Sequence, residues 1–444
     1  MKARTLTAAA FVAAALVTSV GSGQSKGIRP LTLRPASLAN PLLGFSVGRL
    51  DTSLVRLDSR TLLPRGRGVS LERFTAAWSF SPDRRQLVFA SAYSPYSESP
   101  AAVRFIDVST LRRLRDLELG PAAEVQAVDW AAPERLLAVV RSCCPAVSSV
   151  SLIDTASGTV LARHVFEGEL VGAGRAHGAL VLLLEPASFG PVWLAVAGAD
   201  GSFRTVVLDR VLGGVSTSPP PNSYLVDDRA GLAVDPSGGR AYAVAANGPI
   251  AEVDLERLGV TYHTLAKPAS LFGRLHDWLE PKAEAKTAAE RSARFALWLG
   301  DGRLAVFGRN GSARWKDGRL AVRTWPSVLM VVDTSTWTSQ VIDSRSNSAV
   351  VARDMLLSSG WSWDSETQRT IGNGIRVYGA DGRQRFQLLK NRVVVQPEVF
   401  GSHAFVQKPG QDLGYWVVSL ASGQVLRSVR NRPMPFLLRG AGST

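Results

Sequence analysis

The chain has 444 residues, of which 45% are hydrophobic and 20% are charged, and its formal net charge is +14. This composition excludes a largely disordered chain, and the length is compatible with several domains or with one large repeat structure. The excess of cations would favour anionic partners. Alternatively, it reflects a surface that uses Arg as its usual cation, because no run of like charges marks a basic arm.

The first 23 residues have the pattern of an export signal. Lys2 and Arg4 form a basic start, Leu6 to Val20 is apolar, and small residues follow at 21–23. The apolar run of about 15 residues is shorter than the ~20 that a spanning helix needs. We therefore expect a signal peptide at 1–23, a linker at 24–40, and a soluble, extracytoplasmic mature protein that is secreted, periplasmic or cell-wall associated.

An uncleaved membrane anchor is the alternative to this signal peptide. In either case an exported chain does not meet genomic nucleic acid, so nucleic acid is not an expected partner despite the basic charge.

A repeat begins near residue 41, and its clearest copy runs from Phe74 to Leu119. This stretch contains four short apolar segments separated by turn residues such as Ser81-Pro82-Asp83. Pro pre-sets the backbone of a tight turn, and Asp accepts hydrogen bonds from the backbone two residues on. Each segment is therefore predicted to be a strand of a four-stranded antiparallel unit.

Further copies follow in chain order, some of them degraded. The units are 41–64, 74–119, 125–166, 170–208, 231–254, 296–334, 349–389 and 393–429. The ends of their third strands lie about 41 to 57 residues apart, except for one interval of about 79, which matches the ~40 to 50 expected of propeller blades. The sequence therefore predicts an all-β chain, a β-propeller over 41–438 with eight blades; seven is the alternative, since two copies are faint.

The two ends of this region are expected to close the ring. The first unit lacks its first strand, and Met434 to Leu438 offers an apolar segment that can take that place. Closing one blade with both ends hides the edges that an open ring would expose.

Several of these segments resemble the repeat of extracytoplasmic YVTN-type, WD40-like β-propellers. The resemblance is carried by Ser81-Pro82-Asp83 with Leu87 to Ala90, by Asp235 to Val244, by Ile153 to Val160 and by Val331 to Thr336. It implies an architecture and not an activity, because this fold class includes surface-layer proteins, adaptors and enzymes. The Gly-His and Trp-Asp signatures of WD40 blades do not recur, and the blade Trp of quinoprotein dehydrogenases is missing after Gly158 and Gly423.

The resemblance also implies that loops between second and third strands lie on one face around the central channel. Three of these loops are long and aromatic: 91–100 holds Tyr93 and Tyr96, 308–326 holds Trp315 and Trp325, and 360–374 holds Trp361 and Trp363. Such rings beside Arg suit sugars, acidic glycans or an extended peptide. These six residues are the candidate ligand-binding residues, and the alternative is that they only pack the loops onto the blades.

Cys143 and Cys144 are the only cysteines and are adjacent. Outside the cytoplasm they are expected to form a vicinal disulfide, which could be a rigid platform or a redox switch. Two reduced thiols in a buried loop, or a bridge to another chain, are the alternatives.

An insertion at 267–294 separates the fifth and sixth units. Leu271, Leu275, Trp278 and Leu279 recur at helical spacing, Pro281 would end that helix, and Glu290 with Arg294 suggests a second one. We expect a helical cap on the propeller face, or a helix that binds a partner.

No pattern in the chain identifies an active site. The five His residues show no metal-ligand spacing, and no nucleophile elbow, phosphate loop or dinucleotide motif occurs in context. Asp107, Asp154, Asp254 and Asp333 stand at strand ends, where we expect them to serve the turns. No catalytic residue, metal or cofactor is therefore predicted.

The sequence favours an exported, non-enzymatic and monomeric propeller that binds a protein or glycan ligand through its loop face, with anionic ligands favoured by its charge. The alternative is an extracytoplasmic enzyme, such as a quinone-dependent oxidoreductase, a lactonase or a lyase, with Cys143 and Cys144 near its centre.

Overall fold

The computed structural model describes residues 43–47, 52–58, 63–74, 76–92, 100–120, 123–142, 147–217, 225–246, 248–265, 288–316, 319–352, 355–394, 397–400, 402–408, 414–430 and 434–436. Within these ranges every regular element is a β-strand. None of the described segments forms a helix that could cross a membrane. The expected signal peptide and linker lie outside the described residues.

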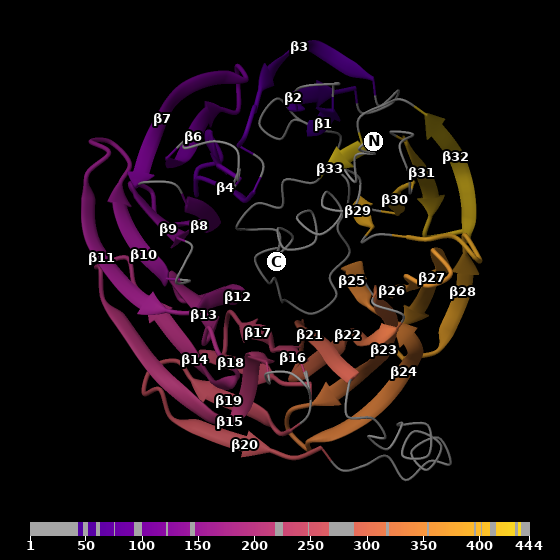
Figure 1. Ribbon diagram of the computed structural model, residues 1–444. Coiled ribbons are helices and arrows are strands. Elements are labelled where there is room, and N and C mark those ends of the chain that lie inside the picture. Colours follow the sequence, from indigo (N-terminus) through magenta and orange to yellow (C-terminus); the bar gives the residue numbers. More distant parts are fainter. Residues whose placement is uncertain are drawn as a thin grey trace, which may run out of the picture.

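Figure 1 shows the sheets arranged radially as a closed ring, which is the architecture of a β-propeller. Five sheets are separate and have four antiparallel strands each. Their strands are β1 (Leu43–Val47), β2 (Thr52–Leu57), β3 (Pro64–Ser70) and β33 (Met434–Phe436); β4 (Trp78–Phe80), β5 (Gln86–Ala90), β6 (Ala101–Asp107) and β7 (Arg112–Gly120); β8 (Ala123–Ala132), β9 (Arg135–Ser142), β10 (Val147–Asp154) and β11 (Val160–Glu167); β17 (Gly231–Asp235), β18 (Arg240–Val244), β19 (Ile250–Asp254) and β20 (Val260–His263); and β29 (Glu398–Phe400), β30 (His403–Gln407), β31 (Gly414–Ser419) and β32 (Gln424–Arg430).

The remaining strands form one continuous sheet of 13 strands. They are β12 (Glu169–Ala176), β13 (Ala179–Glu185), β14 (Gly190–Ala197), β15 (Phe203–Thr217), β16 (Leu225–Arg229), β21 (Ala288–Gly300), β22 (Arg303–Lys316), β23 (Arg319–Asp333), β24 (Thr338–Ser346), β25 (Ser348–Ala352), β26 (Met355–Asp364), β27 (Arg369–Gly379) and β28 (Gln384–Leu388).

The expected count of eight blades, or seven, is therefore wrong, because only five four-stranded blades are separate among the described residues. The physical reason is strand length. β15, β21, β22 and β23 are 13 to 15 residues long, well beyond the usual five or six. The ends of β15 and β21 hydrogen-bond to β16, and the end of β23 hydrogen-bonds to β26, so neighbouring units of the repeat are joined edge to edge.

The expected helical insertion is not supported either, since the described residues contain no helix. Glu290 and Arg294, expected in its second helix, lie in β21, while Leu271, Leu275, Trp278 and Leu279 fall outside the described residues. The segment 288–294 is rich in Ala, Glu and Arg, which suits a helix. Pairing with β16 on one side and β22 on the other overrides that local preference.

The two ends of the described chain meet in one sheet. β33 pairs antiparallel with β1, with Leu43 opposite Phe436 and Phe45 opposite Met434 (Figure 1). β33 thus occupies the place of the missing first strand, as the sequence predicts, and covers the edge of β1.

The recurring Asp residues serve the turns, as expected. The carboxylate Oδ1 of Asp107, Asp154, Asp254 and Asp333 accepts hydrogen bonds from backbone N–H groups two or three residues on, at 2.6 to 3.1 Å. Hydrogen bonds favour the ionised carboxylate and lower the pKa of each of these four groups. The largest effect comes from the Ser109 and Ser335 hydroxyls for Asp107 and Asp333, and from the Ser157 and Arg257 backbone N–H groups for Asp154 and Asp254. These hydrogen bonds fix the tight connections between the third and fourth strands of their units.

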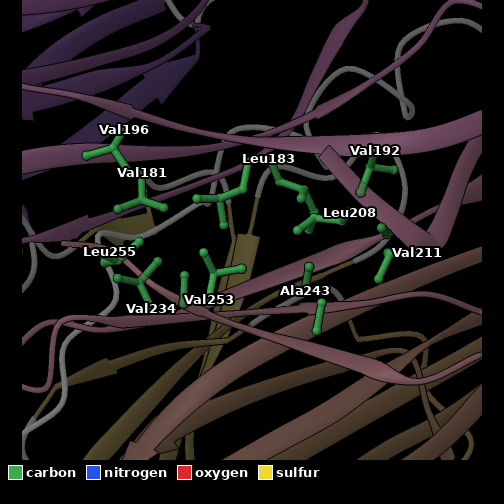
Figure 2. Packing of buried hydrophobic residues seen from close by; sticks show 14 of the residues in the cluster. Val181, Leu183, Val192, Val196, Leu208, Val211, Val234, Ala243, Val253 and Leu255 are labelled. Carbon is green, nitrogen blue, oxygen red and sulfur yellow. The ribbon is translucent and has the colours of Figure 1, made fainter. Parts of the chain in front are cut away.

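The core lies between neighbouring sheets, and Figure 2 shows one such layer. Val181 and Leu183 of β13 and Val192 of β14 pack against Val234 of β17 and Val253 of β19. The middle strands bury both faces, which is why β13 reads as an almost unbroken apolar run. Burial between sheets therefore holds successive parts of the ring together.

We expect Leu183→Ala to lower the free energy of unfolding by about 2–5 kcal/mol, because Leu183 is fully buried and its truncation leaves a cavity. The control is Leu161→Ala on β11, where Leu161 is 47% exposed and the change should stay within about 0.5 kcal/mol. Urea unfolding of both variants measures the difference. Equal losses would contradict the assigned packing.

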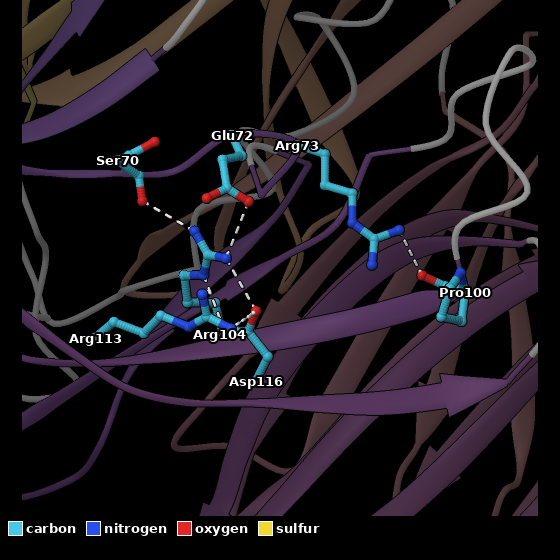
Figure 3. A network of polar contacts seen from close by, with 7 residues as sticks. All are labelled: Ser70, Glu72, Arg73, Pro100, Arg104, Arg113 and Asp116. Carbon is cyan, nitrogen blue, oxygen red and sulfur yellow. Dashed lines mark hydrogen bonds and ion pairs between the residues drawn. The ribbon is translucent and has the colours of Figure 1, made fainter.

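Buried arginines add polar links between sheets. Arg104 of β6 donates to the carboxylate of Asp116 at 2.9 Å, to Glu72 at 3.2 Å and to the Ser70 carbonyl at the end of β3 at 3.0 Å (Figure 3). Its guanidinium also lies 4.2 Å from the centroid of the Phe74 ring. Arg104 thus connects its own blade to the end of the preceding one.

Arg376 of β27 makes an equivalent link inside the 13-stranded sheet. It donates to Asp343 at 2.5 Å and to the Arg345 carbonyl at 2.6 Å, at the end of β24. Asp343 also accepts from the Ser358 hydroxyl at 2.6 Å. Both Arg376 and Asp343 are buried, so neither charge can be hydrated if the other is removed.

Arg376→Ala is expected to lower the free energy of unfolding by about 3–5 kcal/mol, since it leaves the buried Asp343 without its cation. The matched control is Arg383→Ala, whose ion pair with Asp381 is exposed and should contribute about 0–1 kcal/mol. Denaturant unfolding compares the two. A loss as small as that of the control would show that the buried pair contributes little.

Candidate functional site

The structure describes only some of the candidate site residues. Tyr93, Tyr96, Cys143 and Cys144 lie outside the described residues, so their proposed roles stay predictions. Trp315 lies in β22 and Trp325 in β23, while Trp361 and Trp363 lie in β26.

The expected long loops 308–326 and 360–374 are largely strands. They form the ends of the hairpins β22–β23 and β26–β27. The sequence predicts loops here because these stretches separate the second and third strands of their units. In the structure the strands continue through them, and their charged, polar and aromatic residues lack the apolar alternation that identifies a strand, although Ala313 and Ala321 are buried.

We use the name sheet extension for the projecting parts of these strands, residues 225–229 of β16, 288–294 of β21, 308–316 of β22, 319–326 of β23 and 361–364 of β26. Its strands are in continuous register. Asp227 lies opposite Arg291, Arg291 opposite Gly311, Gly311 opposite Thr324, and Thr324 opposite Trp363. Residues that pair directly across a sheet share a face, so this row lies on one face.

The other face is reached by moving one residue along each strand. Trp361 and Trp363 are two residues apart and share the face of Thr324, which we call the Trp363 face. Trp325 follows Thr324 directly and therefore lies on the opposite face, where 39% of its surface is exposed. The structure thus brings Trp361 and Trp363 together and separates Trp325 from them.

The junction between β23 and β26 is fixed by polar contacts. Arg323 forms ion pairs with Asp364 at 3.0 Å and with Glu366 at 3.3 Å. The backbone N–H of Val322 donates to the Ser365 hydroxyl at 2.7 Å, and the Ser365 N–H donates to the Val322 carbonyl at 2.9 Å. These contacts hold Trp363 beside Thr324.

Three arginines lie on the Trp363 face. Arg229 of β16 and Arg309 of β22 flank Ala293 of β21, and Arg291 lies two residues from Ala293. We call Arg229, Arg291 and Arg309 the arginine cluster. Arg291 pairs with Asp227 at 3.2 Å, and Arg229 lies 3.9 Å from Glu169.

Arg309 differs from the other two arginines. Among the described residues its guanidinium has no hydrogen bond or ion pair. Burial lowers its pKa, the neighbouring charges of Arg229 and Arg291 lower it further, and Asp227 opposes them. Arg309 is therefore a half-buried cation held near two others.

A buried carboxyl lies behind this cluster. Glu185, at the end of β13, accepts a hydrogen bond from the Ala230 N–H at 2.7 Å. Burial raises its pKa to about 8, helped by the charges of Glu169 and Asp227 and opposed by the Ala230 hydrogen bond and by Arg229. Because Glu185 is 3% exposed, it serves as an internal contact between β13 and the link into β17 rather than as an acid presented to a substrate.

Glu185 predicts a pH dependence of stability. Its folded pKa of about 8 lies above the usual 4.5, so the folded protein holds a proton that the unfolded chain releases. The stability that this group contributes is present below about pH 4.5 and is lost as the pH rises towards 8. In Glu185→Gln the amide oxygen can still accept from Ala230 and cannot ionise, so stability should fall less steeply between pH 5 and 8.

Urea unfolding at one-unit steps from pH 5 to 9 measures this difference. The exposed Glu118→Gln change is the control and should reproduce the original profile. Parallel profiles for the original protein and Glu185→Gln would contradict the raised pKa.

No family model matches the chain, and no curated protein matches it. Solved structures do resemble it. The dihydro-haem d1 dehydrogenase NirN, in complex with DHE, matches with a TM-score of 0.52 and 14% identity over 92% of this chain and 75% of that chain. The chain is a β-propeller. At this identity the likeness shows the fold alone.

Two further structures match at lower similarity. BamB from Moraxella catarrhalis has a TM-score of 0.43 and 9% identity over 82% of this chain and 92% of that chain. Sqt1 from Saccharomyces cerevisiae has a TM-score of 0.46 and 10% identity over 90% of each chain.

Sequence reasoning missed the arginine cluster. The helical pattern of the insertion 267–294 includes Arg291, and Arg229 stands in a stretch with no recognisable pattern. Only the parallel pairing of β16 with β21, which joins segments far apart in the chain, brings these residues beside Arg309. The short charged run Asp227-Asp228-Arg229 after two apolar residues was the one local signal of a half-exposed strand.

Proposed function

We propose that this chain is an exported, non-catalytic propeller that binds an extended protein or glycan ligand across the Trp363 face of the sheet extension. The observation that carries the proposal is the register of the extension, which aligns Trp361 and Trp363 with three arginines on one face. Export is supported by the basic and apolar pattern of residues 1–23.

The chemistry of this face suits such a ligand. Indole rings provide flat apolar surfaces that stack on sugar rings or on peptide groups, and they bury a large area with little loss of conformational freedom. Guanidinium groups donate paired hydrogen bonds to carboxylate, sulfate or phosphate. A row of these groups spread over five neighbouring strands, from β16 to β26, would contact several units of a chain-like ligand rather than enclose one small molecule.

The two tryptophans can be tested against a third on the opposite face. We expect the double change Trp361→Ala and Trp363→Ala to weaken binding about tenfold or more, since two stacking contacts of roughly 1 kcal/mol each are lost. The melting temperature should stay nearly unchanged because both side chains are only half-buried. Trp325→Ala, on the other face, should bind like the original protein.

Isothermal titration with a polyuronate hexasaccharide, a neutral glucan hexasaccharide and a Glu-rich peptide measures these affinities. A large drop in melting temperature without a change in binding would contradict the proposal, as would an equal effect of Trp325→Ala. Turnover of a bound oligosaccharide would contradict its non-catalytic part.

A further inference from the structure

We propose that Arg229, Arg291 and Arg309 bind an oxyanion group, which is a sulfate, a phosphate or a carboxylate carried by the ligand. This inference deepens the proposed function, because it states what chemistry the ligand of the Trp363 face must carry.

The backbone places the three arginines around two small residues. Arg229, Ala293 and Arg309 form one row across β16, β21 and β22, and Asp227, Arg291 and Gly311 form the next row on the same face. Strands lie about 4.8 Å apart, so Arg229 and Arg309 start about 10 Å from each other across Ala293. Long guanidinium side chains can converge over this gap from both sides.

Ala293 and Gly311 lie between the three arginines, and because both are small, no large side chain from the sheet fills the space there. A Cβ atom added to Gly311 would lie 3.4 Å from the Cβ of Arg291 and 3.4 Å from the Cγ2 of Thr324, so those two side chains flank the glycine on this face. Gly311 itself has no side chain above the sheet. The floor between Arg291 and Thr324 is therefore backbone. Gly311 and Ala293 are themselves buried, so it is the guanidinium groups around them that would contact an oxyanion.

The regular pairing of β22 with β21 sets the direction of Arg309. The register of β22 with β23 shifts between Val306 and Arg309, while the pairing of β22 with β21 continues through Gly308. A Cβ atom at Gly308 would lie 2.0 Å from the Ala293 carbonyl oxygen, so a side chain at this position would clash. The extra residue of this bulge lies in β23, between Pro326 and Met330, so β22 keeps its regular alternation and places Arg309 in the row with Arg229.

The charges of the cluster are not balanced inside the described part of the protein. Arg291 has Asp227 as its close carboxylate partner, and Arg229 has a longer contact with Glu169. Glu169 is also shared with Arg141 at 3.0 Å. Arg309 has no hydrogen-bond or ion-pair partner among the described residues, and Asp227 is the one carboxylate whose charge favours its protonated form. An oxyanion would supply acceptors to Arg309 and would relieve the repulsion among the three guanidinium groups.

This site predicts that small oxyanions bind and stabilise the protein. Inorganic phosphate, inorganic sulfate and glucuronate are titrated separately into the full chain at constant ionic strength, with chloride as the reference ion. The expected result is a saturable heat of binding for at least one of them, together with a rise in melting temperature. The anion that binds best identifies which group the ligand carries.

Arg309→Gln removes the charge that has no partner among the described residues and leaves Asp227 paired with Arg291, so this variant should fold and should bind the anion at least tenfold more weakly. Arg309→Lys keeps the positive charge but cannot donate the bidentate hydrogen bonds of a guanidinium group. We expect it to lose affinity for the anion to an intermediate degree. The matched control is Arg369→Gln. Arg369 pairs with Asp364 across β26 and β27, in the row of Arg323, and therefore lies on the opposite face of the same extension.

Failure of this inference can be told apart from failure of the proposed function. Trp361→Ala with Trp363→Ala should leave the binding of the small oxyanions unchanged. Absence of oxyanion binding to the original protein up to tens of millimolar would overturn the inference, and so would equal binding by Arg309→Gln. The effect of the tryptophans on the larger ligands would still decide the proposed function.

Discussion

Backbone hydrogen bonding between the long strands β21, β22 and β23 and their neighbours β16 and β26 is the interaction on which the proposed binding face depends. Each strand end that projects beyond a blade exposes unpaired N–H and C=O groups, which are costly unless they are paired or hydrated. Here the projecting ends pair with one another. The result is a sheet that continues from the blades, in which the buried Ala293, Ala313 and Ala321 lie between charged and aromatic residues.

The body of the ring is stabilised differently from this extension. Between sheets, fully buried Val, Leu and Ala side chains supply the apolar packing, and burial of such area is the main favourable term in folding. Buried arginines such as Arg104 and Arg376 then satisfy backbone carbonyls at the ends of preceding strands. The ring supplies a rigid support, so that the extension can hold groups that would not stabilise a core.

The arginine cluster illustrates this division. Placing three guanidinium groups near one another and partly out of water opposes folding, as the lowered pKa of Arg309 indicates. Proteins tolerate such arrangements where a ligand later compensates the charge, which is why perturbed ionisable groups concentrate at functional sites. Glu185, by contrast, is a perturbed group with an internal hydrogen-bond partner and little exposure, so its raised pKa reflects packing.

The sequence by itself determined the all-β class, the propeller architecture, the turn function of Asp107 and Asp333, and the pairing of the chain ends through Met434–Phe436. These follow from local patterns, since short apolar runs, turn residues and their spacing act over a few residues. Tertiary structure alone decided that strands would merge into a 13-stranded sheet, that 288–294 would be a strand, and that Arg229 and Arg291 would meet Arg309. Those outcomes depend on pairing between distant segments, which composition and spacing do not encode.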